Sequence, residues 1–199
     1  MNPNVFCVRI YSCFIRKVFV WAPLWGLFVL GPQVSWGHLV VTAAYSKPIP
    51  EGETFILQRR DIVLNSALLV RDVDLIQTFH ERTFRLPEWV SSSGNAYVDC
   101  RIMTGSLYEE ILSGLQKSGF QPLPARPSAV YFVVGPLQKL QSEWRVANVE
   151  VLFSGELSAV FGIGRAGGEP QVLIPRCFSF LDFKLKKDVE KAILEKLKQ

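Results

Sequence analysis

Two cysteines are the strongest candidates for chemistry in this chain of 199 residues. Cys100 lies in the alternating run Tyr97–Ile102 (YVDCRI), on the apolar face of that run, so an inward-pointing thiol is predicted. Cys177 lies in a second strand-like run. In an oxidising compartment the pair can form one disulfide, and the alternative is two separate buried thiols that pack as small apolar groups. The other cysteines, Cys7 and Cys13, stand near the N-terminus; without a CxxC or Cys/His cluster, no structural zinc site is predicted.

The N-terminal segment decides which compartment these thiols meet. Every charge within residues 1–37 is basic, and the apolar run Val18–Leu30 leads to a small-x-small exit at Ser35 and Gly37. This is the pattern of a secretory signal peptide, and the 13 apolar residues are fewer than the roughly 20 of a spanning helix. Cleavage after Gly37 would make His38 the first residue of the mature chain. The alternative is an uncleaved membrane anchor; in both cases the protein is predicted to be exported, in the periplasm or associated with the cell envelope.

The two histidines offer little to a catalytic site. A Ser-His or Cys-His pair would need His80 as its base, and no G-x-S-x-G elbow is present. If His38 were N-terminal, its amine and imidazole could bind copper with help from His80. One partner histidine far along the chain is a weak ligand set, so neither a metal site nor a catalytic site is predicted, and the protein is not expected to be an enzyme.

A glycine motif imitates a cofactor site. Gly162–Gly167 (GIGRAG) matches G-x-G-x-x-G, the fingerprint of dinucleotide-binding proteins. That site requires a helix directly after the glycines, because the helix N-terminus holds the pyrophosphate. Here the residues that follow, Gln171–Ile174, are typical of a strand. A glycine-rich β-hairpin turn is therefore predicted, and no cofactor.

The net charge excludes a nucleic-acid partner. The formal charge of the whole chain is +4, but three of its basic residues belong to the leader, which leaves 19 basic and 18 acidic residues in 38–199. A nucleic-acid site needs a dense basic stripe to displace the counterions of the phosphates. Such a stripe is not present in the sequence.

Hydropathy patterning predicts two amphipathic helices. Leu107, Ile111 and Leu115 recur at four-residue spacing, after a Ser106-x-x-Glu109 capping box, and predict a helix over 107–118 that stops at Gly119. The second helix, over 185–198, has the same four-residue spacing of apolar residues.

Strands account for most of the remaining chain. Strands are predicted over 38–45, 54–64, 67–71, 72–90, 129–134, 143–160 and 171–183. Turns are predicted at 47–52, at Asn65-Ser66, over 91–95 and over 162–170, where Gly, Pro, Asn and Ser collect. Residues 38–199 are therefore predicted to form a single α+β domain, an antiparallel-dominated sheet with both helices packed on one face.

Aromatic residues gather in two parts of the chain. They are Phe79, Phe84 and Trp89 before the serine loop, and Trp144, Phe161, Phe178, Phe180 and Phe183 near the C-terminus. Two interpretations remain open, ordinary core packing and an exposed patch that contacts protein or lipid.

From residue 54 onward the chain resembles a group of small envelope proteins, the auxiliary components of lipid-transporting ABC systems and related outer-membrane assembly lipoproteins. The resembling stretches are Ile62–Phe79, Leu107–Gln121 and Val149–Gly162. The chain departs from the group in lacking a lipobox cysteine and in having an extra segment before the first helix. The resemblance implies an accessory or scaffold protein without catalysis, partnered with other envelope proteins and associated with the membrane through its N-terminal segment if that is retained. The second hypothesis is an exported protein that holds a lipid or other apolar ligand between helix and sheet.

Overall fold

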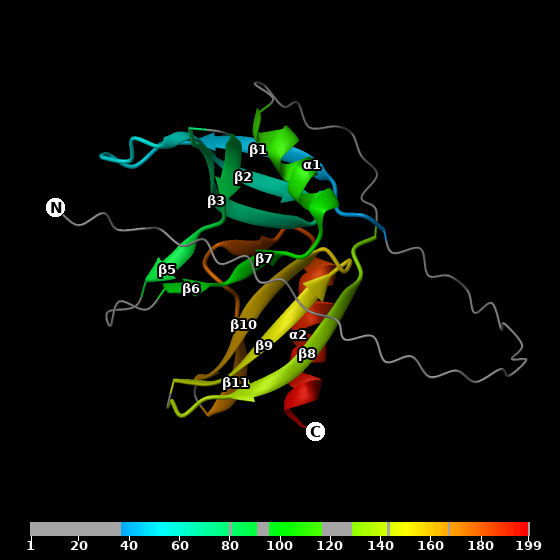
Figure 1. Ribbon diagram of the computed structural model, residues 1–199. Coiled ribbons are helices and arrows are strands. Elements are labelled where there is room, and N and C mark those ends of the chain that lie inside the picture. Colours follow the sequence, from blue (N-terminus) through cyan, green and yellow to red (C-terminus); the bar gives the residue numbers. More distant parts are fainter. Residues whose placement is uncertain are drawn as a thin grey trace, which may run out of the picture. The chain divides into compact units, whose positions relative to one another are not determined.

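The computed structural model describes residues 37–79, 81–90, 96–116, 129–142, 144–166 and 168–198 (Figure 1). Its first half contains β1 (Val41–Lys47), β2 (Ile56–Leu64), β3 (Leu68–Gln77), β4 (Arg82–Arg85), β5 (Glu88–Val90), β6 (Ala96–Val98), β7 (Cys100–Ile102) and α1 (Gly105–Gln116). Its second half contains β8 (Phe132–Lys139), β9 (Arg145–Phe153), β10 (Leu157–Ala166), β11 (Glu169–Leu173), β12 (Phe178–Phe180) and α2 (Phe183–Leu197). The predicted leader, with Ser35, lies outside these residues except for Gly37.

The larger strands form two antiparallel sheets (Figure 1). The first has the order β1-β2-β3-β12, with β4 also paired to β3; the second has the order β11-β10-β9-β8, with β7 also paired to β10. Helix α1 packs against β1, β2 and β3, whereas α2 packs against β8, β11 and β12. The α+β class with antiparallel sheets is confirmed. The strands form two main sheets instead of the single sheet predicted, and each helix contacts strands of both: α1 also contacts β7 of the second sheet, and α2 contacts β12 of the first.

The two halves repeat one topology. Each is an antiparallel meander of four strands (β1–β4 and β8–β11), then a short fifth strand and a helix. The fifth strands cross over: β7 pairs with β10 of the second sheet, and β12 pairs with β3 of the first. In the described chain only the hairpin β5–β6, inserted between β4 and β7, has no counterpart in the second half.

The central hairpins of the two halves turn in the same way. Leu64 pairs with Leu68 in one and Phe153 with Leu157 in the other, so each turn contains three residues. The first two turn residues have positive φ in both cases, 49° and 55° in the Asn65-Ser66 turn and 48° and 72° in its counterpart. This backbone region favours Asn and Gly. The turn predicted at Asn65-Ser66 is confirmed, whereas the predicted strand 143–160 is interrupted by the second turn.

The two central turns also form hydrogen bonds with the ends of the exchanged strands β7 and β12. The amide of Met103, just after β7, donates to the Glu156 carbonyl at 2.7 Å. The amide of Leu181, just after β12, donates to the Ala67 carbonyl at 2.7 Å. Because Ala67 and Glu156 occupy the same turn position, the two halves are related by a pseudo-twofold operation.

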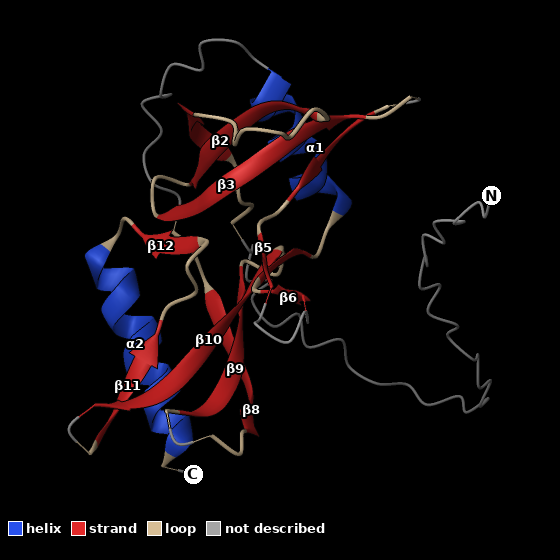
Figure 2. Ribbon diagram, turned by 90° about the vertical axis from the view of Figure 1, so that its left-hand side faces the viewer, coloured by secondary structure: helices blue, strands red, loops and turns tan. Residues whose placement is uncertain are grey.

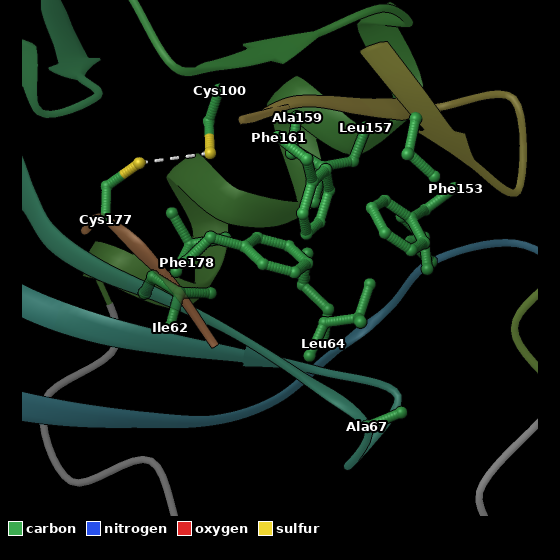
Figure 3. Close-up of a cluster of buried hydrophobic side chains, with 14 of the residues drawn as sticks. Ile62, Leu64, Ala67, Cys100, Phe153, Leu157, Ala159, Phe161, Cys177 and Phe178 are labelled. Atoms are coloured by element: carbon green, nitrogen blue, oxygen red, sulfur yellow. Dashed lines mark hydrogen bonds between the residues drawn. The ribbon is translucent and has the colours of Figure 1, made fainter. Parts of the chain in front are cut away.

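A single core joins the halves. Phe153 of the second sheet stacks with Phe178 at a ring-centroid distance of 5.3 Å, and Phe161 meets Phe178 edge to face at 5.8 Å. The three rings lie beside Ile62 and Leu64 of β2 (Figure 3). All five side chains are at most 1% exposed. For these phenylalanines the core-packing interpretation is confirmed.

Helix α1 begins two residues before the predicted start. The amide of Leu107 donates to Thr104 Oγ1 at 3.4 Å, so Thr104 caps the helix. The predicted Ser106/Glu109 capping box is wrong, because Ser106 Oγ lies 3.2 Å from Glu156 Oε1 and donates to that carboxylate. The predicted stop at Gly119 lies outside the described residues.

The segment predicted as one returning strand, 171–183, is also corrected. It divides into β11 in the second sheet and β12 in the first, with Pro175 between them. The amide of Phe178 donates to the Pro175 carbonyl at 3.0 Å and so closes a turn. This turn ends the pairing with β10, and proline has no amide hydrogen with which to continue it. After β12, Asp182 caps α2 by accepting from the amides of Lys184 and Leu185.

Candidate functional site: a cleft lined by arginines

A cleft of about 800 Å³ lies between the hairpin β5–β6 and the outer face of the second sheet. Asn148 of β9 and Val160 of β10 line it, and both alternate with buried core residues, which places them on the face away from the core. The residues from Leu173 to Arg176, which lead from β11 toward β12, form another part of the lining. We call this site the arginine cleft, after Arg101, Arg145 and Arg176.

The hairpin β5–β6 contributes an aromatic pair. Trp89 and Tyr97 pair across the two short strands, with ring centroids 5.4 Å apart and planes inclined by 34°. The two side chains are 49% and 47% exposed, so they contribute little to the core. Figure 1 and Figure 2 both show this hairpin apart from the helices and beside β10.

Arg145 is held at the start of β9 by its packing on a glycine. A Cβ atom at Gly162 would lie 2.5 Å from Arg145 Nε, so a larger residue there would displace the Arg145 guanidinium from its place against β10. This explains the first glycine of the G-x-G-x-x-G sequence. Gly162 and Gly164 lie within β10, and the chain continues into the antiparallel strand β11. The predicted β-hairpin is therefore confirmed, but its turn begins after β10 ends at Ala166 and not at residue 162.

Arg145 Nε and Asn148 Oδ1 are both buried and have no hydrogen-bond partner among the described residues. Arg101 and Arg176 are exposed. Within the part of the chain that the structure describes, none of the three arginines forms an ion pair. Apart from the longer-range interaction of Arg145 with Asp99, their charges are therefore left to the solvent or to a ligand.

Among the described residues that line the cleft, Asp99 is the one acidic residue. Burial raises the pKa of the Asp99 carboxyl, and the positive charge of Arg145 opposes that effect only in part. Three arginines against one aspartate leave the cleft positively charged. The Asp99 carbonyl accepts from the Val160 amide at 2.8 Å, which anchors this residue to β10.

The structure brings Cys100 and Cys177 together, with Sγ atoms 3.2 Å apart and both thiols buried (Figure 3). Cys100 is inward, as predicted. The hydrogen bond between the thiols, together with burial, raises the pKa of Cys100. At Cys177 the same hydrogen bond lowers the pKa, and burial opposes that effect only in part. Both cysteines are free, buried thiols in this structure, so the disulfide and the alternative of two separate buried thiols both stay predictions.

A second, smaller pocket of about 400 Å³ surrounds Glu156, which is 5% exposed. Its carboxylate accepts from the Leu39 amide at 2.6 Å and from Ser106, and His38 Nδ1 lies 3.0 Å away. Burial opposes ionisation here, but these hydrogen bonds outweigh it and lower the Glu156 pKa. The carboxylate stands between the hydroxyl and the imidazole, so His38 is not arranged to take the proton of Ser106, as a nucleophile–base pair requires.

The copper hypothesis receives no support at His38. Its ring lies beside Glu156, and His80 lies outside the described residues. Among the residues with described positions, no group of three His, Cys, Asp or Glu side chains could hold a metal ion. No described helix is long and apolar enough to cross a membrane.

Sequence reasoning missed the arginine cleft. Its three arginines are spread over 76 positions, from Arg101 to Arg176, and none stands in a motif. The available signal was the pair Trp89 and Tyr97 on either side of the serine loop 91–95, a polar turn that would bring them together as neighbours in a hairpin. Comparison with protein-family profiles, with curated proteins and with solved structures yields no match to this chain.

Proposed function

We propose that this protein is a non-catalytic, exported interaction protein of the cell envelope, an accessory of a transport or secretion assembly, and that the arginine cleft is the surface that holds its partner. One observation carries the proposal: three arginines without ion pairs line the same cleft as a half-exposed aromatic pair. The arginines are Arg101, Arg145 and Arg176, and the pair is Trp89 and Tyr97. Tyr, Trp and Arg are the residues enriched at the energetic centres of protein interfaces.

Export is proposed from the leader pattern of residues 1–37 and agrees with the closeness of Cys100 and Cys177. A disulfide persists in an oxidising compartment and is rare in the cytosol.

The alternative, a lipid or other apolar ligand held between helix and sheet, has less support. Val189 and Ile193, the residues of α2 that face its sheet, are 0% exposed and belong to the same cluster as the stacked phenylalanines. Interiors packed in this way leave no room for a ligand unless the fold opens.

Affinity purification from detergent-solubilised envelopes tests the proposal. Tagged wild-type protein should retain a stable partner, and Trp89→Ala and Arg145→Gln should each reduce retention, by about 2 kcal/mol or roughly thirtyfold for a residue at the centre of an interface. Arg82→Gln is the matched control, because it removes an exposed arginine from β4 of the first sheet. Absence of any retained protein, or equal retention by all four proteins, would contradict the proposal.

A further inference from the structure

We infer that the arginine cleft binds an acidic segment of a partner protein, in which carboxylates flank an aromatic or other flat apolar side chain. The inference rests on the proposed function and adds the chemistry of the partner. Its evidence is the charge of the cleft, its aromatic wall and its place in the repeated fold.

The positive charge of the cleft favours an anionic ligand. The described lining of the cleft contains three arginines, Arg101, Arg145 and Arg176, and one acidic residue, Asp99. Burial disfavours the charged form of Asp99 and raises its pKa. Guanidinium groups bind carboxylates through two parallel hydrogen bonds, which are shorter and stronger than those between neutral groups. Because Arg145 packs against Gly162, part of the entropy of ordering its long side chain is lost before any ligand arrives.

The aromatic pair Trp89 and Tyr97 favours a peptide as the ligand. Trp89 and Tyr97 present half of their surface beside the arginines, so a ligand that satisfies both must carry an apolar or aromatic group next to its carboxylates. Peptide side chains provide that combination over a few residues. Anionic lipid surfaces are typically contacted by clusters of several basic residues, mostly on exposed segments, and the described lining of this cleft contains no lysine and is concave.

The repeat shows that the hairpin is not required by the fold. The second half passes from β11 to β12 through a short turn, whereas the first half inserts β5 and β6 between β4 and β7. The inserted strands are three residues each and mostly exposed. An exposed two-stranded hairpin gains little stability of its own, so its aromatic pair is best explained by a ligand.

Selection of a random dodecapeptide library on the folded, full-length mature chain tests the inference. Wild type should enrich peptides with two or more Asp or Glu residues beside Phe, Tyr, Trp or Leu, and the binding of an enriched peptide should weaken markedly as salt screens the charges. The variant Arg101→Gln/Arg145→Gln/Arg176→Gln should lose about tenfold or more in affinity for that peptide.

A second triple variant controls for the loss of three charges. Lys184, Lys187 and Lys191 are exposed on α2, and changing them together to Gln should leave the affinity of the enriched peptide unchanged. Circular dichroism of both triple variants establishes that they are folded. Because the arginines replaced are exposed or half-buried, loss of folding is not expected.

Three results would overturn the inference: no enrichment, enrichment of basic or purely apolar peptides, or equal affinity of both triple variants. Binding of phosphatidylglycerol vesicles that depends on the three arginines would also overturn it, in favour of a lipid headgroup. If an envelope protein is retained through Trp89 while no acidic peptide is enriched, the proposed function stands and this inference falls. If neither occurs, both fall.

Discussion

Oxidation of Cys100 and Cys177 is expected to stabilise the fold by about 4.5 kcal/mol relative to the dithiol. The two sulfur atoms are 3.2 Å apart, and a disulfide brings them to about 2.0 Å, so a movement of roughly 1 Å suffices. Cys100 opens β7, and Cys177 immediately precedes β12. The bond would therefore join the two strands that the halves exchange.

The magnitude follows from the length of chain that the bond closes. The cysteines are separated by 77 positions, and in the chain-entropy account a loop of that length reduces the entropy of the unfolded chain by about 15 cal/mol/K, or about 4.5 kcal/mol at room temperature. For a chain of this size each kcal/mol shifts the melting temperature by about 2–4 °C, so reduction should lower it by roughly 9–18 °C.

The assay is urea unfolding followed by tryptophan fluorescence, on air-oxidised protein with and without a phosphine reductant. Non-reducing peptide mapping should find Cys100 joined to Cys177. The Cys100→Ala/Cys177→Ala variant is the control, because its unfolding should not respond to the reductant.

Two results would refute the reasoning. Two free thiols after oxidation would show that the pair does not form a bond in the folded protein. A mapped bond whose reduction changes the free energy of unfolding by less than about 1 kcal/mol would show that constraint of the unfolded chain is not what the bond contributes.

Three further predictions concern single residues, each measured by urea unfolding. Thr104→Ala should cost about 0.5–2 kcal/mol through loss of the helix cap, and no loss would place the cap elsewhere. Glu156→Gln should destabilise by about 1–3 kcal/mol at about pH 7. Because the folded pKa of Glu156 is lowered, its contribution is complete above the ordinary pKa of a glutamate and is lost as the pH falls through the lowered pKa, so wild type and variant should converge below it; a gap independent of pH would contradict this. Gly162→Ala should cost about 0.5–1.5 kcal/mol by forcing the flexible Arg145 side chain into another rotamer. Gly105→Ala, where an added Cβ meets nothing within 4 Å, should not destabilise; equal effects would refute the packing argument.

Local patterning predicted those features whose cause is local. The Asn65-Ser66 turn was predictable because these residues tolerate positive φ and stand between two apolar runs. The inward face of Cys100 followed from alternation, since side chains along a strand point to opposite sides. The apolar spacing of both helices identified their buried faces, although Asp182 was missed as the cap of α2 and Thr104 as the cap of α1.

The exchange of fifth strands could not be predicted from patterning. Cys100–Ile102 and Phe178–Phe180 alternate as any half-buried strand does, and alternation does not say which of two sheets a strand joins. That choice depends on the turn at Pro175, on the inserted hairpin β5–β6 and on the shared packing of both sheets. The single predicted sheet became two for this reason.

By itself, the sequence determined the antiparallel α+β class, the positions of the central turns and the buried faces of the helices, because these follow from residue conformational preferences and from hydrophobic periodicity. Only the tertiary structure decided that Cys100 meets Cys177 and that Arg101, Arg145 and Arg176 surround one cleft. These contacts join residues far apart in the chain, and they depend on which strands pair across the two halves. The candidate function therefore lies in the part of the molecule that strand exchange and one inserted hairpin assemble.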